Sequence, residues 1–455
     1  MDTITIPLED VEKLLSRDEG HFLDYKSKDI APSSLTKTVS AFANADGGEI
    51  LLGISENLGA KNWIGFDDLE QANAHVQLIN QVLPLGQGAK LQPIVCDDLP
   101  GVIFQIEVEK NREIVPSSDG KVYVRRGAQN LPVNEGEPMD RLRLTKGITS
   151  FETQTLKASE DVITNSTETI EFMIEMVPHQ EPDKWLRKQN LIVDNNPTVA
   201  GVILFAEEPQ ALLPKRCGVK VYCYRTSEDE GTREALEGTP ETIEGCLYKQ
   251  VYASVAATKQ IIEAIRRMTP TGLIEVEYPE ETLHEIITNA LLHRDYSIPD
   301  DVHIRIYDNR VEVESPGRLP GHITPQNILD ERFARNGTLV RIVNKFPNPP
   351  NKDVGEGLNT AFRAMQQLRL RQPEILQGEN SVLVTIRHEQ LASPEQRIMS
   401  YLDSHESISN GVAREICVIR EDWRIRTLFG RLVDAGMIEK VPGSSTSNTA
   451  YRKKV

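Results

Sequence analysis

The sequence predicts a multidomain protein of mixed α/β and α+β class. The chain has 455 residues, enough for two to four domains at roughly 100–200 residues each. Helix-like and strand-like hydrophobic patterns alternate along most of the chain, and the pattern turns basic and helix-rich after residue 393. These observations give four expected regions, 1–135, 136–275, 276–390 and 393–455.

The composition is that of a folded globular chain, with 39% hydrophobic residues and a net charge of −17. Such an acidic balance excludes a uniformly basic surface, so any nucleic-acid contact must come from local patches. The five cysteines form no Cys-x-x-Cys pair, which argues against zinc or disulfide frameworks and fits a reducing cytoplasm. The acidic N-terminus is unlike a signal peptide, and no apolar run reaches the roughly 20 residues that span a bilayer. We therefore expect no membrane partner.

In the first region, residues 1–135, stretches with helical spacing of apolar residues alternate with stretches that have strand spacing. Apolar residues recur at helical spacing in three stretches and at strand spacing in three others, which predicts an α/β domain. The helices are expected at 6–17, 33–45 and 71–83, and the strands at 49–55, 102–110 and 122–127.

Charged residues gather at the strand ends of this region. The stretch EGHFLDYKSKD brings Glu19, Asp24 and Lys26 close together, and Glu56 follows the next strand. If FLDYK is extended, Asp24 and Lys26 share one face. Carboxylates and a lysine on neighbouring strands can hold a divalent ion beside a phosphodiester. The structural alternative is solvated charge at strand ends.

The stretch AFANADGGEILLG, residues 41–53, joins a helix to a strand. Phe42 is expected to fill the core, and Asn44 to cap the helix end or take a left-handed turn. Gly47 and Gly48 permit positive φ or a close approach by a ligand.

These motifs resemble the Schlafen/AlbA-type domain of Schlafen proteins and bacterial ATP-binding regulators. The resemblance rests on FLDYKSKDI, LTKTVSAFANADGGEILLGISE and VYVRRGAQN. It implies a nucleic-acid-binding domain over 1–135, in which Arg125 and Arg126 are candidate phosphate contacts or, alternatively, a surface pair. In Schlafen proteins an acidic trio supports RNA cleavage. Here Glu19 and Asp24 match its first two members, and Glu56 is our placement for the third.

The second region is expected to be mostly helical and to connect the domains. Residues 199–206 and 217–225 are apolar runs that predict buried strands, and 245–268 predicts one long helix.

The third region carries a second polar constellation. Glu285 and Asn289, at i and i+4, share one face of the predicted helix ETLHEIITNALLHRDY. A hairpin around residues 308–309 then leads into Pro-Gly, and Gly355 and Gly357 open a helix. Glycines at a helix N-terminus let backbone N–H groups approach phosphate.

This order resembles the GHKL ATPase fold of gyrase and histidine kinases, in the divergent version that follows Schlafen/AlbA-type domains. The stretches NALLHRDY, IYDNRVEVESPGRLP, RNGTLVRIV and GEGLNTAF carry it, and NPTVAGVILFAEEPQ before them also fits. The resemblance implies an α/β sandwich that binds ATP and Mg²⁺. Asn289 matches the Mg²⁺-coordinating asparagine and Glu285 the water-activating position.

The same resemblance assigns the remaining nucleotide contacts. Gly317 matches the glycine after the adenine-contacting strand, and Gly355 and Gly357 match the phosphate-loop glycines. Ser315 falls near the slot of the adenine-reading aspartate. Arg335 and Asn336 lie where a nucleotide lid would start. Hydrolysis is expected to be slow, because no arginine or lysine finger is evident.

The last region, 393–455, contains ten Lys/Arg and eight Asp/Glu, so it is slightly basic in an acidic chain. Its pattern, three helices and a hairpin, resembles a winged helix-turn-helix. On that resemblance the third helix enters the DNA major groove and the wing contacts phosphates. The candidate contacts are Arg420, Arg424, Arg426 and Arg431 on or near the helix and Arg452, Lys453 and Lys454 on the wing. A protein-docking winged helix is the alternative, and Trp423, Leu428, Phe429 and Leu432 are expected in the core.

The function that these expectations describe is an ATP-binding, nucleic-acid-binding regulator, for example of transcription. In it the nucleotide state gates engagement of DNA or RNA, and the chain acts as a homo-oligomer. One alternative is an ATP-gated, metal-dependent nuclease that uses Glu19, Asp24, Lys26 and Glu56, for example in phage defence. Another is a non-catalytic interaction scaffold.

Overall fold

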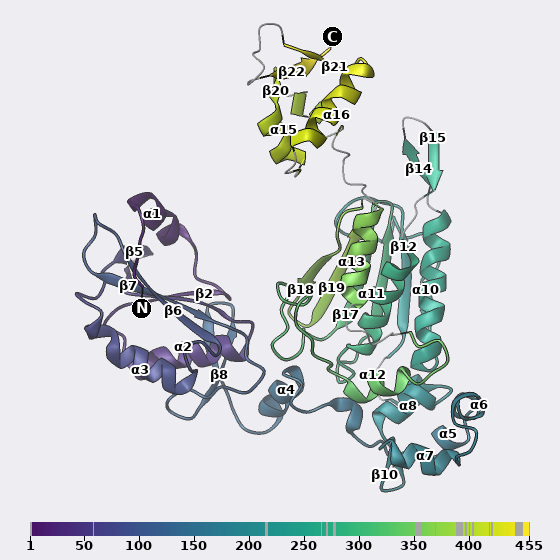
Figure 1. Cartoon of the computed structure of the whole chain (residues 1–455). Coiled ribbons are helices and arrows are strands. Elements are labelled where there is room, and N and C mark those ends of the chain that lie inside the picture. Colours follow the sequence, from purple (N-terminus) through teal and green to yellow (C-terminus); the bar gives the residue numbers. More distant parts are fainter. Residues whose placement is uncertain are drawn as a thin grey trace. The chain divides into compact units, whose positions relative to one another are not determined.

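The computed structural model is drawn in Figure 1. It describes residues 2–454 except 58, 214–216, 265, 270–271, 276–278, 351–356, 369, 388–394, 396–397, 400, 403–404, 418, 420–421 and 442–448. These residues form two compact units. We call residues 1–365 with 372–387 the N-terminal unit, and residues 366–371 with 388–455 the C-terminal unit.

The N-terminal unit begins with a five-stranded mixed sheet of order β1-β6-β7-β3-β2. The parallel strands β2 and β3 are joined by helix α2, whereas β7 runs antiparallel to both β3 and β6. Two hairpins, β4–β5 and β8–β9, extend from this sheet domain. The strands are β1 Ile4–Thr5, β2 Leu23–Lys26, β3 Gly48–Leu52, β4 Ile54–Asn57, β5 Ala60–Trp63, β6 Ala89–Val95, β7 Val102–Val108, β8 Val122–Arg126 and β9 Gln129–Val133.

Apolar side chains on both faces of this sheet bury it between helices. Helices α2 (Pro32–Asn44) and α3 (Asn73–Val82) contribute Leu35, Val39 and Ile79 to one core. The other core contains Val11 of helix α1 (Leu8–Ser16) and Trp63 of β5. The short 3₁₀ turn η1 (Glu70–Ala72) precedes α3. The α/β prediction for this region is confirmed.

The AFANADGG stretch has a structural explanation. Phe42 is fully buried, as expected, and Gly47 has φ +79°. Asn44 does not cap its own helix: its side chain donates to the carbonyls of Val115 and Tyr123 and accepts from the Val115 N–H. A Cβ on Gly48 would lie 2.6 Å from the Phe42 ring, so the close approach at this glycine is by a core aromatic group.

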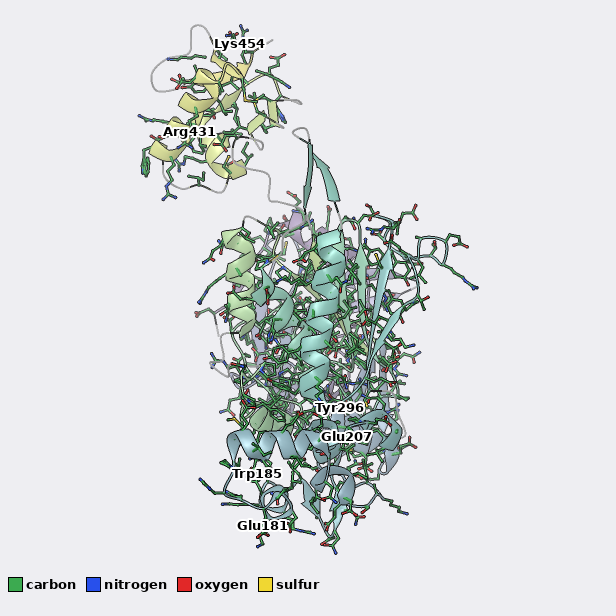
Figure 2. All side chains as sticks on the ribbon, turned by 90° about the vertical axis from the view of Figure 1, so that its right-hand side faces the viewer. Glu181, Trp185, Glu207, Tyr296, Arg431 and Lys454 are labelled. Carbon is green, nitrogen blue, oxygen red and sulfur yellow. The ribbon has the colours of Figure 1, made fainter. Side chains whose placement is uncertain are left out.

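The region from 136 to 213 is a layer of short helices. These are α4 Glu137–Thr145, η2 Phe151–Thr153, α5 Asp161–Thr164, α6 Thr167–Met176, α7 Pro182–Lys188, α8 Val199–Phe205 and α9 Pro209–Leu212, with the two-residue strands β10 Ile192–Val193 and β11 Asn196–Pro197. Trp185 of α7, labelled in Figure 2, packs against Phe172 and Phe205 with ring centroids 5.0 and 5.9 Å away.

Residues 199–206 were expected to form a buried strand, and this prediction is wrong. They form helix α8, in which every side chain is buried. A short apolar run has no periodicity that separates a buried strand from a buried helix. The local signal is Thr198, whose Oγ1 caps the helix by accepting from the Gly201 N–H at 3.1 Å.

The second sheet of the N-terminal unit has six strands in the order β13-β12-β16-β17-β19-β18. Helices α10 (Leu247–Ala264), α11 (Glu280–Leu292) and α13 (Gly357–Gln367) lie over it (Figure 1). The hairpin expected around residues 308–309 joins β16 to β17. The strands are β12 Val219–Tyr224, β13 Glu241–Ile243, β16 Val302–Tyr307, β17 Arg310–Pro316, β18 Glu374–Gln377 and β19 Ser381–Arg387.

This sheet recruits β12, β13 and α10 from the region that was expected only to connect two domains. Strand β12 pairs in parallel with β16, from Val219↔Val302 to Tyr224↔Tyr307. A separate hairpin, β14 (Arg266–Thr269) with β15 (Gly272–Glu275), and helix α12 (Gly337–Val343) complete the elements of this part. The result is the expected α/β sandwich.

The C-terminal unit contains α15 (Asn410–Cys417), α16 (Asp422–Asp434) and a three-stranded sheet of order β20-β22-β21. The strands are β20 Ile408–Ser409, β21 Ile438–Lys440 and β22 Ala450–Lys453. Most of the first helix expected here, at 393–404, lies outside the described residues. The winged helix-turn-helix assignment stays a prediction. Among the described residues no helix is long and apolar enough to cross a membrane.

Candidate functional site

Helix α11 presents a carboxylate and an amide side by side. Leu283, Ile287 and Leu291 of this helix are buried, which fixes the opposite face toward a cavity. On that face the Asn289 Nδ2 donates to Glu285 Oε1 at 2.8 Å. Burial raises the pKa of Glu285, and the hydrogen bond from Asn289 offsets part of this rise. Because its nitrogen is engaged, Asn289 keeps its amide oxygen as an acceptor for a ligand.

The first residue of helix α13 packs directly on this pair. A Cβ placed on Gly357 would lie 2.1 Å from Glu285 Oε1, so any side chain at this position would displace the Glu285 carboxylate. The N-terminal end of α13 therefore approaches the Glu285 carboxylate with bare backbone. Gly355, the other expected phosphate-loop glycine, lies outside the described residues.

Strand β17 and its exit form the opposite wall of the cavity. Ser315 Oγ donates to the Ala290 carbonyl at 2.7 Å, which ties the strand to α11. Gly317 has φ +103°, and a Cβ there would lie 2.5 Å from the Asp295 Cβ. The chain can turn sharply at this point only with glycine.

The cavity between these elements has a volume of about 290 Å³. Its wall is largely apolar, and its polar lining includes Glu285, Asn289, His293, Ser315 and Arg318. Burial, together with the charge of Arg335, lowers the pKa of His293 to about 4, so this ring is neutral at pH 7. Its Nδ1 is buried without a hydrogen-bond partner among the described residues. The apolar lining is Ile286, Ala290, Val313, Leu319, Pro320, Ile323, Ile328, Phe333, Ala334, Val340, Leu358, Ile375, Val382 and Val384.

Arg335 and Asn336, expected at the start of a lid, lie behind this wall and do not line the cavity. Both are buried. Arg335 forms an ion pair with Asp295 at 3.2 Å and donates to the Arg318 carbonyl. Asn336 donates to the carbonyls of Leu292 and Arg294, both at 2.9 Å. In this structure the two residues anchor the loop that leaves β17.

The acidic cluster of the N-terminal sheet has internal partners. Asp24 is 2% exposed, and its two oxygens lie 2.7 Å from Lys26 Nζ and 3.3 Å from Arg125 Nη1. Glu19 accepts from the Tyr25 N–H at 2.8 Å. Burial raises the pKa of Glu19, and the neighbouring Asp24 raises it further.

Glu56 does not complete a trio with these two carboxylates. It lies on β4 in register with Lys61 of β5. Among the described residues no group of three or more His, Cys, Asp or Glu side chains could hold a metal ion. The structure therefore brings Glu19, Asp24 and Lys26 together, and Glu56 is not part of a metal-binding group with them.

The two candidate phosphate contacts of β8 differ sharply. Arg125 is 2% exposed and donates to the carbonyls of Gly20 and Leu23 as well as to Asn130. Its guanidinium is an internal group here. The side chain of Arg126 is 76% exposed and lies at the surface, with its Nε 3.9 Å from Glu379 Oε1.

Two family models match the chain. Residues 19–134 match the model described as "Schlafen, AlbA_2", and residues 300–386 match HATPase_c_4, described as "Putative ATP-dependent DNA helicase recG C-terminal". The chain carries a Schlafen/AlbA-type domain and an ATPase-type domain. Their order is the one that the sequence resemblance implied.

No curated protein matches the sequence. Among solved structures, the chain is similar to the DIP2311 protein from Corynebacterium diphtheriae. The two share 17% identity over 98% of this chain and 96% of that chain, with a TM-score of 0.42.

The basic residues predicted in the C-terminal unit lie on α16 and the hairpin, and Figure 2 labels Arg431 and Lys454 there. Arg426 pairs with Asp422 at 2.7 Å, and Arg452 pairs with Glu439 at 2.6 Å. Arg424 lies over the Trp423 ring, 5.5 Å from its centroid, and Lys453 is exposed on β22. Arg420 lies outside the described residues.

Trp423 was expected in the core, and this prediction is wrong. Its side chain is 64% exposed, whereas Leu428, Phe429 and Leu432 are buried as expected. Trp423 occupies the first turn of α16, on a face that the hydrophobic cluster of this unit does not cover.

Sequence reasoning missed the residues that join the two family-matched domains. Among them are Asp46 and Lys110 of the Schlafen/AlbA-type domain and Arg318 and Gln377 of the ATPase-type domain. Asp46 stands in the quoted ADGG stretch, where a lone acidic residue between a buried helix and two glycines was the available signal. Nothing in the sequence around Lys110 indicates its partners.

Proposed function

We propose that this protein binds ATP with Mg²⁺ in the cavity beside α11 and that the bound nucleotide controls its engagement of DNA or RNA. The observation that carries the proposal is the Glu285–Asn289 pair, which faces the cavity while the side-chain-free Gly357 packs on it. The match of residues 300–386 to an ATPase-type model and of residues 19–134 to a Schlafen/AlbA model supports it.

The donor chemistry of this pair fits Mg²⁺. Magnesium prefers oxygen ligands and usually keeps part of its water shell while it contacts phosphate. Asn289 donates a hydrogen bond from Nδ2 to Glu285 Oε1, so its amide oxygen is the atom that would contact the ion. With the ion bound, Glu285 would be the residue of this pair that accepts a proton from water in a hydrolysing step. Burial raises the pKa of Glu285 and so favours that acceptance.

The remaining cavity fits a nucleotide base better than a small polar ligand. Aliphatic side chains from β17, β19 and α11 line it, and pockets of roughly 300–1,000 Å³ are usual for small-molecule sites. The Ser315 hydroxyl donates its hydrogen bond to the Ala290 carbonyl, so toward a ligand its oxygen can act only as an acceptor. An amino group on the base would suit it. The start of α13 offers backbone N–H groups to phosphate.

The proposal that the protein binds nucleic acid depends on exposed basic residues in two regions of the chain. Arg126 is exposed on β8, and Arg424, Arg426, Arg452 and Lys453 lie on the basic C-terminal unit. We propose that these residues contact phosphates, and that Arg125 supports Arg126 from within. The regulator and homo-oligomer assignments belong to this proposal.

Titration calorimetry with ATP and Mg²⁺ tests the nucleotide site on the full chain. The Asn289→Ala substitution should weaken binding by about 100-fold, because it removes a proposed metal ligand. Glu281→Gln, which lies exposed on the same helix, is the matched control and should bind like the wild type. Equal affinity of Asn289→Ala and the control would contradict the site.

A second candidate function is metal-dependent cleavage of RNA or DNA at the N-terminal acidic cluster. The proximity of Glu19, Asp24 and Lys26 favours it. Cleavage that requires Mg²⁺ or Mn²⁺ and disappears in Asp24→Asn would support this function. Cleavage that persists in Asp24→Asn would exclude this cluster as its source.

A further inference from the structure

The loop that lines the cavity after β17 is held from outside the ATPase-type domain. Lys110 follows β7 in the Schlafen/AlbA-type domain, and its Nζ donates to the Leu319 carbonyl at 2.8 Å and to the Ile323 carbonyl at 3.1 Å. Leu319 and Ile323 both line the cavity. One lysine of the N-terminal domain therefore fixes two points of the nucleotide pocket's wall.

Asp46 holds the same loop through a second set of contacts. Its carboxylate forms an ion pair with Arg318, which also lines the cavity, and accepts from Gln377 Nε2 at 2.7 Å. Gln377 in turn accepts from the Leu319 N–H at 2.9 Å. His21 Nε2 lies 2.7 Å from Asp46 and Lys110 Nζ lies 3.6 Å from it. Asp46 and Lys110 thus form one network around residues 318–323.

A third contact reaches the far side of the loop. The Arg112 guanidinium lies over the Phe333 ring, 5.0 Å from its centroid, and Phe333 lines the cavity. A Cβ on Gly147, just after α4, would lie 2.5 Å from the same ring. The packing leaves little freedom for Phe333 to move alone.

Burial makes this network sensitive to change. The side chains of Asp46 and Lys110 are 6% and 5% exposed. Burial lowers the pKa of Lys110 to about 8, with Asp46 opposing this shift. Burial would raise the pKa of Asp46, but the hydrogen bond from His21 and the charges of Arg318 and Lys110 lower it well below its usual range. Removing one partner leaves buried carbonyls or a buried charge unpaired, which is costly.

We propose that Asp46 and Lys110 are positioning residues for the nucleotide pocket, through which its occupancy is linked to the conformation of the Schlafen/AlbA-type domain. This inference rests on the proposed nucleotide site. Coupling of this kind is reciprocal: whatever the N-terminal domain binds changes nucleotide affinity by the same factor. The ADGG stretch, which turns from α2 into β3, then has a function beyond its own fold.

A pair of buried lysines provides the test. Lys146 is also almost fully buried, but it donates to the carbonyls of Ala43 and Asn111, both within the Schlafen/AlbA-type domain. Lys110→Met and Lys146→Met therefore remove similar groups from the same surroundings, and both should lower the melting temperature of the full chain. Only Lys110→Met should weaken ATP–Mg²⁺ binding in calorimetry, by about tenfold, with Lys146→Met within about twofold of the wild type.

Hydrogen exchange supplies a readout that a loss of stability alone would not move. Addition of ATP and Mg²⁺ should slow exchange in peptides covering residues 42–50 of the wild type and of Lys146→Met, but not of Lys110→Met. Equal affinities of the two variants, or no response in residues 42–50 of the wild type, would overturn the inference and leave the nucleotide site standing. A wild type that binds no nucleotide would overturn both.

Discussion

Glu285 is a half-buried carboxylate of the ATPase-type domain and Asp24 a buried one of the Schlafen/AlbA-type domain, and their surroundings differ. Glu285 has Asn289 as its hydrogen-bonded partner and borders a cavity. Asp24 is enclosed, with Lys26 on one oxygen and Arg125 on the other. A carboxylate that borders a cavity with a neutral partner can still receive a cation, whereas one already paired with two cations mainly stabilises its domain. The number of partners a charged group already has therefore separates the better site candidate from the weaker one.

The largest effect is expected from substitution of Arg125 on β8, which tests how far Asp24 depends on its buried partner. Arg125→Ala removes the buried partner of Asp24 and should lower local stability by about 3–5 kcal/mol. The neighbouring Arg126→Ala removes an exposed side chain and should change it by no more than about 0.5 kcal/mol. Hydrogen exchange of the β2 and β3 amides measures both changes. Similar effects of the two would show that Asp24 does not depend on Arg125.

Substitution of two glycines, each the first residue of a helix, tests the surroundings of Glu285 at the cavity. Gly357→Ala places a methyl group against the Glu285 carboxylate and forces it to shift, so it should cost about 1–2 kcal/mol and weaken nucleotide binding. Gly337→Ala, at the start of α12, meets no atom within 4 Å and should leave stability and binding unchanged or slightly improved. Thermal unfolding with calorimetry checks both. Normal binding by Gly357→Ala would mean that the helix start can move away from Glu285.

The smallest effect is expected in the pH dependence of stability, through the buried Lys146 of the Schlafen/AlbA-type domain. Burial, reinforced by Lys110 and opposed by Asp46, lowers the pKa of Lys146 to about 7. In the unfolded chain a lysine has a pKa near 10.4. Between these values the unfolded chain holds more protons, so stability should rise with pH above about 7, by roughly 1–2 kcal/mol up to pH 9. Lys146→Met should reduce this rise in melting temperature, and the part that remains is expected from Lys110, whose pKa burial lowers to about 8. An unchanged slope would assign the whole rise to other groups.

Much of the fold was predictable from local patterns. Helices α2, α3 and α11 and the β16–β17 hairpin follow from periodicity and turn residues that agree with their burial. The strand prediction for residues 199–206 was wrong because an eight-residue apolar run fits either a strand or a helix. The prediction that Trp423 is buried was wrong because it rested only on the aromatic side chain. In the structure Trp423, at the start of α16, lies outside the hydrophobic core of the C-terminal unit.

The candidate site was predictable only where its residues share one element. Glu285 and Asn289 lie one helical turn apart, so their spacing alone placed them together. Arg335 and Asn336 were expected at a lid, and their buried partners come from residues 144, 292, 294, 295 and 318, which no local pattern connects to them. Asp46 and Lys110 meet residues more than two hundred positions later in the chain.

The pairing of β12 with β16 has a consequence for the order of events during synthesis. The first sheet is complete once β7 has left the ribosome at Val108, because all five of its strands precede that residue. Strand β12 sits inside the second sheet but must wait for Val302–Tyr307 before its parallel neighbour exists. Until then the nascent chain displays an unpaired apolar edge, the kind of surface that invites misassociation and chaperone capture. Chains cut short between residues 225 and 300 should accordingly aggregate, while the N-terminal sheet within them is already formed.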